Sequence, residues 1–212
     1  MPFPLDLILV HPEPAACEAF RDRFAGLPRV DVVERVLDDL EPHDCFVTAG
    51  NAFGIMTAGI DAAVIEKHGV ALMERVQRRI LDDYLGEQPV GTCFLVETGA
   101  PDFPFVAHAP TMRMPGPVDG TDAVYRATWA ALLSVYRHNG AVRQGTSDQP
   151  EIRSVAMPAM GTGFGSVSFS ESARQMAAAY RQYLSPPHRL DWDEAIVCHR
   201  AVAFDGGQRV VR

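Results

Sequence analysis

The chain has 212 residues, of which 47% are hydrophobic and 22% are charged, so we predict a single globular domain over residues 1–212. A formal net charge of −8 argues against non-specific binding to nucleic acid or to anionic lipid. No apolar run reaches the roughly 20 residues that a membrane-spanning helix needs, and no membrane partner is expected.

Apolar, β-branched runs alternate along the chain with segments of helical periodicity. In chain order, the expected elements are a strand at 5–10, a helix at 14–26, strands at 30–36 and 44–49, helices at 60–69 and 70–86, strands at 91–98 and 103–110, a helix at 121–140, a strand at 153–160, a helix at 170–184 and a strand at 194–204. Ser168, with Glu171 three residues later, indicates a capping box at the start of the last helix. The alternation predicts a layered α/β domain with a largely parallel central sheet.

The four cysteines form no C-x-x-C pair, which argues against a zinc or redox motif. Cys45, Cys93 and Cys198 lie in apolar, strand-like runs, where a free thiol behaves as a small hydrophobic side chain. We therefore expect a reducing, cytoplasmic setting without disulfides. His108, in another apolar run, is expected to be a core histidine with satisfied hydrogen bonds.

Two of the expected strands run into glycine-rich loops that then open helices, and ligands of open α/β sheets bind beyond such strand ends. The first loop, VTAGNAFGIMTAGID (47–61), carries the amide of Asn51 and the carboxylate of Asp61. Asp61 enters a helix, where the N-terminus stabilises the anion. Taken alone, the loop also fits a plain turn, with Asp61 as a helix cap and Asn51 as a turn residue.

The second loop, AMGTGFGSVSFSES (159–172), has glycines at alternate positions, Gly161, Gly163 and Gly165. Glycines allow consecutive backbone N–H groups to wrap an anion, and the following helix N-terminus adds partial positive charge. The loop is neither a P-loop nor a dinucleotide fingerprint, and by itself it also fits an ordinary strand-to-helix turn.

Together these segments resemble the macrodomain family. DCFVTAGNAFGIMTAGIDAAVIEKHG (44–69) is similar to the macrodomain motif of a strand ending in Asn, a glycine-rich loop and a Val-Asp that opens a helix. VAMPAMGTGFGSVSFSESA (155–173) resembles the second loop of the family, in which Pro-Ala precedes a Gly-aromatic-Gly turn. PVGTCFLVETG (89–99) and FPFVAHAPTM (103–112) resemble the strands between them. The sequence of the first loop is most similar to that of the phage-tail-type branch of macrodomain-like proteins.

The resemblance implies a three-layer α/β/α sandwich with a mixed, largely parallel sheet, and ADP-ribose as ligand. It implies that the diphosphate is cradled by Gly161, Thr162, Gly163, Phe164 and Gly165. The facing loop would contribute backbone amides from Gly59 and Ile60, together with the neighbouring Gly50. The adenine would be read by Asp38 or by its close rival Asp39. Asn51 would bind the distal ribose, with Phe164 packed near it, and Asp61 would lie by the bond to be broken.

The function implied is binding of ADP-ribose or a derivative with hydrolysis at the distal ribose, either removal of mono-ADP-ribose or deacetylation of O-acetyl-ADP-ribose. The scheme needs no cofactor and no metal. Expected partners are ADP-ribose or an ADP-ribosylated substrate, and nucleic acid enters only as an ADP-ribosylated target. The alternatives are a non-catalytic ADP-ribose reader and a phage-associated structural module with a vestigial pocket. GIMTAG replaces the usual run of glycines, and this departure bears on hydrolysis more than on the fold.

Overall fold

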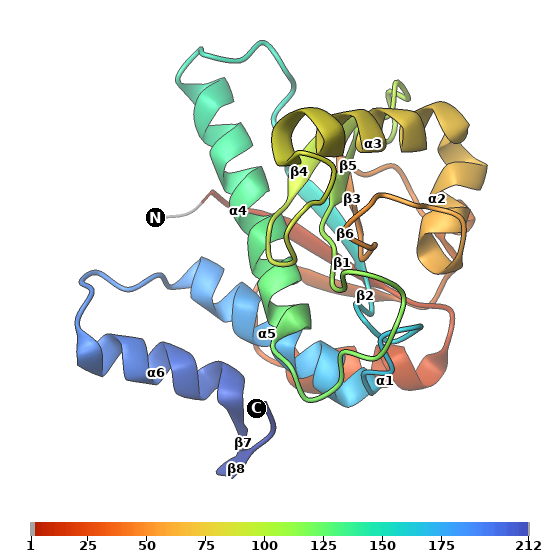
Figure 1. Cartoon of the computed structure of the whole chain (residues 1–212). Helices are drawn as coiled ribbons and strands as arrows, with labels where there is room; N and C mark the ends of the chain where they lie inside the picture. Colours follow the sequence, from red (N-terminus) through yellow and green to blue (C-terminus); the bar gives the residue numbers. More distant parts are fainter. Residues whose placement is uncertain (1–2, 212) are drawn as a thin grey trace.

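The computed structural model describes residues 3–211, while residues 1–2 and 212, which the single-domain prediction also covers, lie outside the described residues. A central sheet is covered by helices on both faces (Figure 1). In chain order the elements are β1 (Asp6–Val10), α1 (Pro14–Arg23), β2 (Val30–Val33), the 3-10 turn η1 (Leu37–Asp39), β3 (Cys45–Thr48), α2 (Gly59–His68), α3 (Val70–Tyr84), β4 (Phe94–Glu97), β5 (Phe105–His108), α4 (Ala123–Arg143), β6 (Ser154–Pro158), α5 (Phe169–Leu184), α6 (Trp192–Ala203), β7 (Phe204–Asp205) and β8 (Gln208–Arg209).

The main sheet has six strands in the order β2-β1-β6-β3-β5-β4. Neighbouring strands are parallel except for β4, which pairs antiparallel with β5 at one edge. The expectation of a three-layer sandwich with a mixed, largely parallel sheet is therefore confirmed.

Alternation along each strand divides the core into two clusters, because successive side chains of a strand point to opposite faces. Leu7 and Leu9 of β1 belong to the cluster with apolar residues of α1, α4 and α5. Val10 belongs to the other cluster, with residues of α2 and α3 such as Val64 and Val76. Both faces of the sheet are thus buried, as expected for a parallel sheet.

Two helix ends differ in detail from the sequence expectation. The Ser168 side chain caps α5 by accepting a hydrogen bond from Glu171 N at 3.2 Å, but the Glu171 carboxylate pairs with Arg174 instead of returning to the cap. Helix α4 continues past Asn139 and Gly140 to Arg143. Asn139 is buried, and its side-chain amide holds the backbone of Ile152 rather than ending the helix.

The strand expected at 194–204 is wrong, because this segment forms helix α6. Its N-cap is Asp191, whose carboxylate accepts from Glu194 N at 3.0 Å. The helix packs on α5 outside the sheet (Figure 1). Only Val202 and Ala203 at its end are buried, whereas Trp192, Ile196 and Val197 are exposed. Cys198, expected in a strand, lies on this helix beside Gln182.

Candidate functional site

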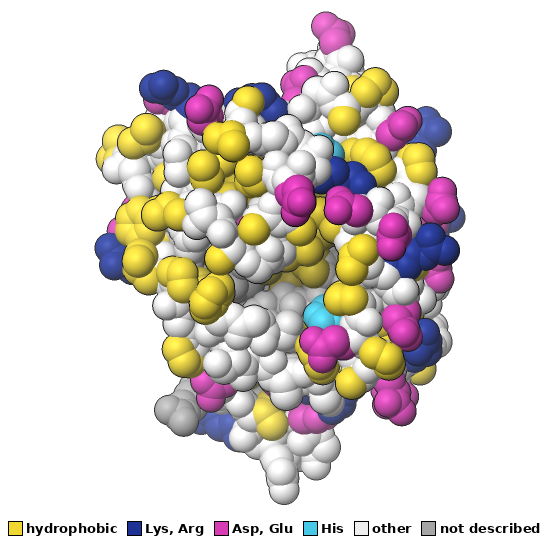
Figure 2. All heavy atoms as spheres, turned by 90° about the vertical axis from the view of Figure 1, so that its right-hand side faces the viewer, with side chains coloured by type: hydrophobic (Ala, Val, Ile, Leu, Met, Phe, Trp, Pro, Cys, Tyr) yellow, Lys and Arg dark blue, Asp and Glu magenta, His cyan; other side chains and the backbone are white. Residues whose placement is uncertain are grey.

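The loops that leave β1, β3 and β6 meet at the carboxyl end of the sheet, because these neighbouring strands are parallel. Between the loops lies a cavity of about 560 Å³. Figure 2 shows it as a hollow bordered by hydrophobic side chains and backbone. Both glycine-rich loops line this cavity, so the two segments that the sequence singles out do share one site.

The second loop presents backbone donors to the cavity. Residues 161–165 all line it, and within the described part of the chain their five consecutive N–H groups donate to no protein acceptor. The loop is held in shape by other groups: Ser166 N donates to Gly163 O at 3.0 Å and Val167 N to Gly161 O at 3.1 Å. A Cβ on Gly165 would lie 2.3 Å from Gly161 O, so only glycine fits this turn. A row of free amides of this kind is an anion-binding arrangement.

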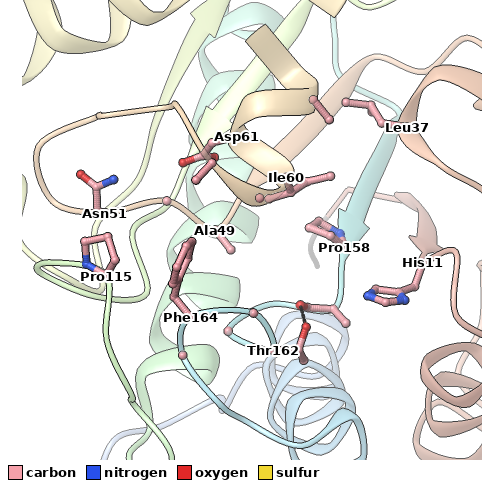
Figure 3. Close-up of a pocket in the computed structure, with 18 of the residues that line it drawn as sticks. His11, Leu37, Ala49, Asn51, Ile60, Asp61, Pro115, Pro158, Thr162 and Phe164 are labelled. Carbon is pink, nitrogen blue, oxygen red and sulfur yellow. Dashed lines mark hydrogen bonds between the residues drawn. The ribbon is translucent and has the colours of Figure 1, made fainter. Parts of the chain in front are cut away.

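The first loop supplies the start of helix α2 on the facing wall. Gly59 and Ile60, the first two residues of α2, line the cavity. Amides in the first turn of an α-helix have no partner within the helix, and they carry the positive end of its dipole. Phe164 projects from the second loop toward Ala49 and Asp61 (Figure 3). The expected amide donors therefore face the cavity from both sides.

Asn51 lines the cavity, but its side chain is engaged by its own loop. Its Nδ2 donates to Ile55 O at 2.9 Å, and its Oδ1 accepts from Phe53 N at 3.1 Å and from Ile55 N at 3.3 Å. In the structure, Asn51 therefore has the turn-forming role, which was one of the two alternatives that the sequence left open. A role in binding the distal ribose stays a prediction.

Asp61 lines the cavity and is only 5% exposed. It does not cap α2, because the N-cap residue is Ala58, and no side chain caps this helix. Its Oδ1 has no protein partner. Burial raises the pKa of Asp61 to about 7, so the stabilised anion expected at a helix N-terminus is not the dominant effect here.

Asp38 and Asp39 lie on η1 with exposed side chains, and neither lines the cavity. Their neighbour Leu37 does line it, together with Arg35. The backbone of this segment is held by Lys67, whose Nζ donates to Leu37 O at 3.3 Å. The adenine-reading role of either carboxylate stays a prediction.

One wall of the cavity was missed from the sequence. Val10, His11 and Pro12, at the end of β1, line the end of the cavity opposite Asn51, where Figure 3 shows His11 and Leu37. The sequence did indicate this wall in part, because residues 5–10 were an expected strand, and the carboxyl end of a strand lies at an end of the sheet. What the sequence lacked was the strand order that places β1 next to β6.

His108 lies beneath the first loop and is fully buried. Its Nδ1 is 2.6 Å from Oε1 of Gln88, but its Nε2 has no protein partner. The expectation of a satisfied core histidine is therefore only half met. Burial lowers the pKa of His108 to about 4. Among the described residues, no group of three or more His, Cys, Asp and Glu side chains is arranged to hold a metal ion.

Comparison with known proteins identifies the family. A model of the Macro domain family matches residues 47–176, which include both cavity loops. The chain belongs to the macrodomain family. A 158-residue stretch is 32% identical to an uncharacterized protein of Aquifex aeolicus, covering 73% of this chain and 85% of that protein. A 136-residue stretch is 32% identical to an uncharacterized protein of Aeropyrum pernix, covering 64% of this chain and 62% of that relative.

The fold of this macrodomain is also that of a solved structure. A mutant of the Oceanobacillus iheyensis macrodomain superposes with a TM-score of 0.58 at 17% sequence identity, over 88% of this chain and 83% of that chain. Identity this low shows a common fold and nothing more. The phage-tail-type branch stays a prediction. No helix within residues 3–211 is both long and apolar enough to cross a membrane.

Proposed function

We propose that this macrodomain binds ADP-ribose or an ADP-ribose derivative and hydrolyses a bond at the distal ribose. The observation that carries the proposal is the row of five free amides at 161–165, which faces the N-terminus of α2 across one elongated cavity. Arg35 is the one Lys or Arg among the described residues that line the cavity, so an anion there is bound mainly by backbone N–H groups. The volume of about 560 Å³ is in the range of small-molecule sites.

The cavity gives the ligand an orientation. The diphosphate would lie between residues 161–165 and the first turn of α2. The adenine would lie toward Val10 and His11, and the distal ribose toward Asp61 and Phe164. The Oceanobacillus iheyensis macrodomain, which has this fold, was solved with ADP-ribose, and this supports the choice of ligand.

Hydrolysis would use Asp61 as the general base. In the removal of mono-ADP-ribose, a water molecule beside the distal ribose would form a bond to C1″ while the bond from C1″ to the attached group breaks. In the deacetylation of O-acetyl-ADP-ribose, the water would instead add to the acetyl carbonyl carbon, and the bond from that carbon to the ribose oxygen would break. Asp61, helped by a phosphate oxygen of the ligand, would orient the water and take its proton, and the leaving group would take up a proton. The amides would hold the diphosphate and so fix the position of the ribose. Because its pKa is about 7, Asp61 changes between acid and base near neutral pH.

Binding is tested by thermal unfolding with ADP-ribose, AMP and NAD. Ligand at 100 times its dissociation constant should stabilise the protein by about 2.7 kcal/mol through mass action. We expect ADP-ribose to stabilise more than either other nucleotide. No response at millimolar ADP-ribose would reject the proposal and favour a structural module with a vestigial pocket.

Catalysis is tested by hydrolysis of mono-ADP-ribosylated protein and of O-acetyl-ADP-ribose by wild type and Asp61→Ala. Loss of turnover with retained binding would support Asp61 as the base, and equal turnover would reject that role. A non-catalytic reader is the second candidate, favoured by the engagement of the Asn51 side chain within its own loop. Calorimetric affinity without turnover in the wild type would select it.

A further inference from the structure

Helix α6 buries little of its own surface. Of its twelve residues, only the last two, Val202 and Ala203, are buried. The Cys198 thiol donates to Oε1 of Gln182 at 3.5 Å, so this side of the helix faces α5. A helix of this length is marginally stable in water unless an apolar face packs against another element. The side of α6 that faces away from α5 is therefore a candidate contact surface.

Large apolar side chains lie on this outer side of α6. Ile196 and Val197 are 50% and 62% exposed, and Trp192, one turn before Ile196, is 83% exposed. Asp193, Ile196, Val197 and Arg200 have the spacing i, i+3, i+4 and i+7, so they form one stripe along the helix. Exposed apolar side chains that gather on one face indicate an interaction surface.

The charges of this stripe are placed symmetrically about its apolar centre. Asp193 precedes Ile196 by three residues, and Arg200 follows Val197 by three residues. Two copies of α6 packed antiparallel about a twofold axis would therefore place Asp193 of each copy beside Arg200 of the other, with Ile196 against Val197 between them. Within residues 3–211, no ion pair includes Asp193 or Arg200. The stripe is thus complementary to itself in both charge and polarity.

We propose that α6 is the contact helix of a homodimer, in which the stripe of Asp193, Ile196, Val197 and Arg200 packs antiparallel on the same stripe of a second copy. An anionic membrane surface fits this helix less well, because its first turn is acidic and the chain has a net charge of −8. A second copy instead satisfies both the apolar centre and the charges at its two ends.

The proposed contact lies apart from the cavity. In Figure 1, α6 lies on the opposite side of the molecule from α2, and none of the described residues that line the cavity belongs to α6. A dimer formed through α6 would therefore leave the cavity of each copy open. The dimer does not depend on the proposed function, and each can be tested without the other.

Sedimentation equilibrium of the full chain over a range of protein concentrations measures the association. One helix from each copy makes a small interface, so we expect a dissociation constant in the micromolar range, as for contacts of less than about 1,200 Å². Val197→Glu should raise this constant at least about tenfold, because the twofold axis places a carboxylate in the apolar centre from both copies. Leu81→Glu is the matched control and should associate like wild type, because Leu81 is 57% exposed on α3.

Charge reversal tests the antiparallel arrangement. Asp193→Arg would bring positive charges together in the dimer, and Arg200→Asp would bring negative charges together, so each variant alone should dimerise at least about tenfold more weakly. An equimolar mixture of the two variants should recover the association, because each copy then supplies the charge that the other lacks. This recovery separates a lost contact from a change in the folding of α6 within either variant, and it keeps the test valid if Val197→Glu fails to fold.

Two results would overturn the dimer: a wild type that stays monomeric up to about 1 mM, or a mixture that associates no better than the separate variants. A monomeric wild type that binds vesicles of anionic phospholipid would also overturn it, and would assign the surface of α6 to a membrane. Thermal stabilisation by ADP-ribose should be the same in the α6 variants as in wild type. Failure of the dimer and failure of ligand binding are therefore observed separately.

Discussion

The buried side chains of Asp61 and His108 have opposite effects on stability as the pH changes. Asp61 has a pKa of about 7 in the folded protein against an ordinary 3.8, so its contribution to stability is present below pH 4 and is lost as the pH rises toward 7. His108 has a pKa of about 4 against 6.5, so its contribution is present above pH 6.5 and is lost as the pH falls toward 4. In the wild type the two dependences largely offset each other.

Asp61→Asn should expose this compensation. Because asparagine does not ionise, the variant does not lose the stability that the wild type loses when Asp61 ionises. The stability of the variant relative to wild type should therefore rise by at most about 4 kcal/mol between pH 4 and pH 7. Urea unfolding at a series of pH values measures the difference. A difference that is flat or falls with pH would contradict the buried, raised pKa of Asp61.

At the scale of elements, Gly165 is the glycine of the second loop whose added Cβ would meet the closest backbone atom. In Gly165→Ala the new Cβ would overlap Gly161 O, and the turn would have to shift, costing about 1–3 kcal/mol. Gly163→Ala is the matched control in the same loop, because its Cβ meets nothing within 4 Å. Urea unfolding should show a loss for the first variant and near wild-type stability for the second. Equal losses would mean that the loop is more adaptable than this contact implies.

A buried arginine of α5, Arg174, connects this helix to α6. The guanidinium of Arg174 pairs with Glu171 and donates to the backbone carbonyls of Ala201, Val202 and Phe204 at the end of α6. Arg174→Met keeps the apolar stem but leaves the three carbonyls without this donor, and Glu171 keeps only its bond from Gln175. It should cost about 3 kcal/mol or more.

Hydrogen exchange should locate that loss in α6, with faster exchange of its amides in Arg174→Met. Arg79→Met is the control, since Arg79 is in an exposed i,i+4 pair with Asp83 and should change stability by no more than about 0.5 kcal/mol. Unchanged α6 protection in Arg174→Met would show that apolar contacts with α5 suffice.

Periodicity predicted the elements of the sandwich and failed at α6 for an identifiable reason. EAIVCHRAVAF (194–204) is apolar enough to fit a buried strand or a helix, and short apolar runs of this kind do not distinguish the two. The deciding signal was the acid pair Asp191 and Glu194, of which Asp191 caps the helix. Asp191 lies before the expected strand and Glu194 is its first residue, and the strand interpretation gave neither of them a role.

At the scale of the whole molecule, the position of the site at the carboxyl ends of the parallel strands could be predicted from the sequence. The orientation of individual side chains around it could not. Parallel strands bring their carboxyl ends together, so the meeting of the two glycine-rich loops followed from the fold class. The exposure of Asp38 and Asp39, and the position of Gln88 beneath the first loop, depend on local turns that spacing does not encode.

The charge of the molecule gives a prediction about salt. The protein carries a net charge of −8, and the described residues that line the cavity include no lysine and one arginine, Arg35. Binding of ADP-ribose through backbone amides should therefore weaken little as salt is added, because screening also reduces the repulsion between two anions. Calorimetry at low and high sodium chloride measures this. A steep fall in affinity that disappears in Arg35→Ala would instead assign the binding to that side chain.

Main-chain donors at 161–165 have an evolutionary consequence. Every residue except proline carries the same N–H group, so homologues can exchange most side chains of this loop without losing a single donor. What must be inherited is the path of the backbone, including the one turn that excludes a Cβ. Divergence to 17% identity, as between this chain and the Oceanobacillus iheyensis protein, is then compatible with retention of the same backbone fold.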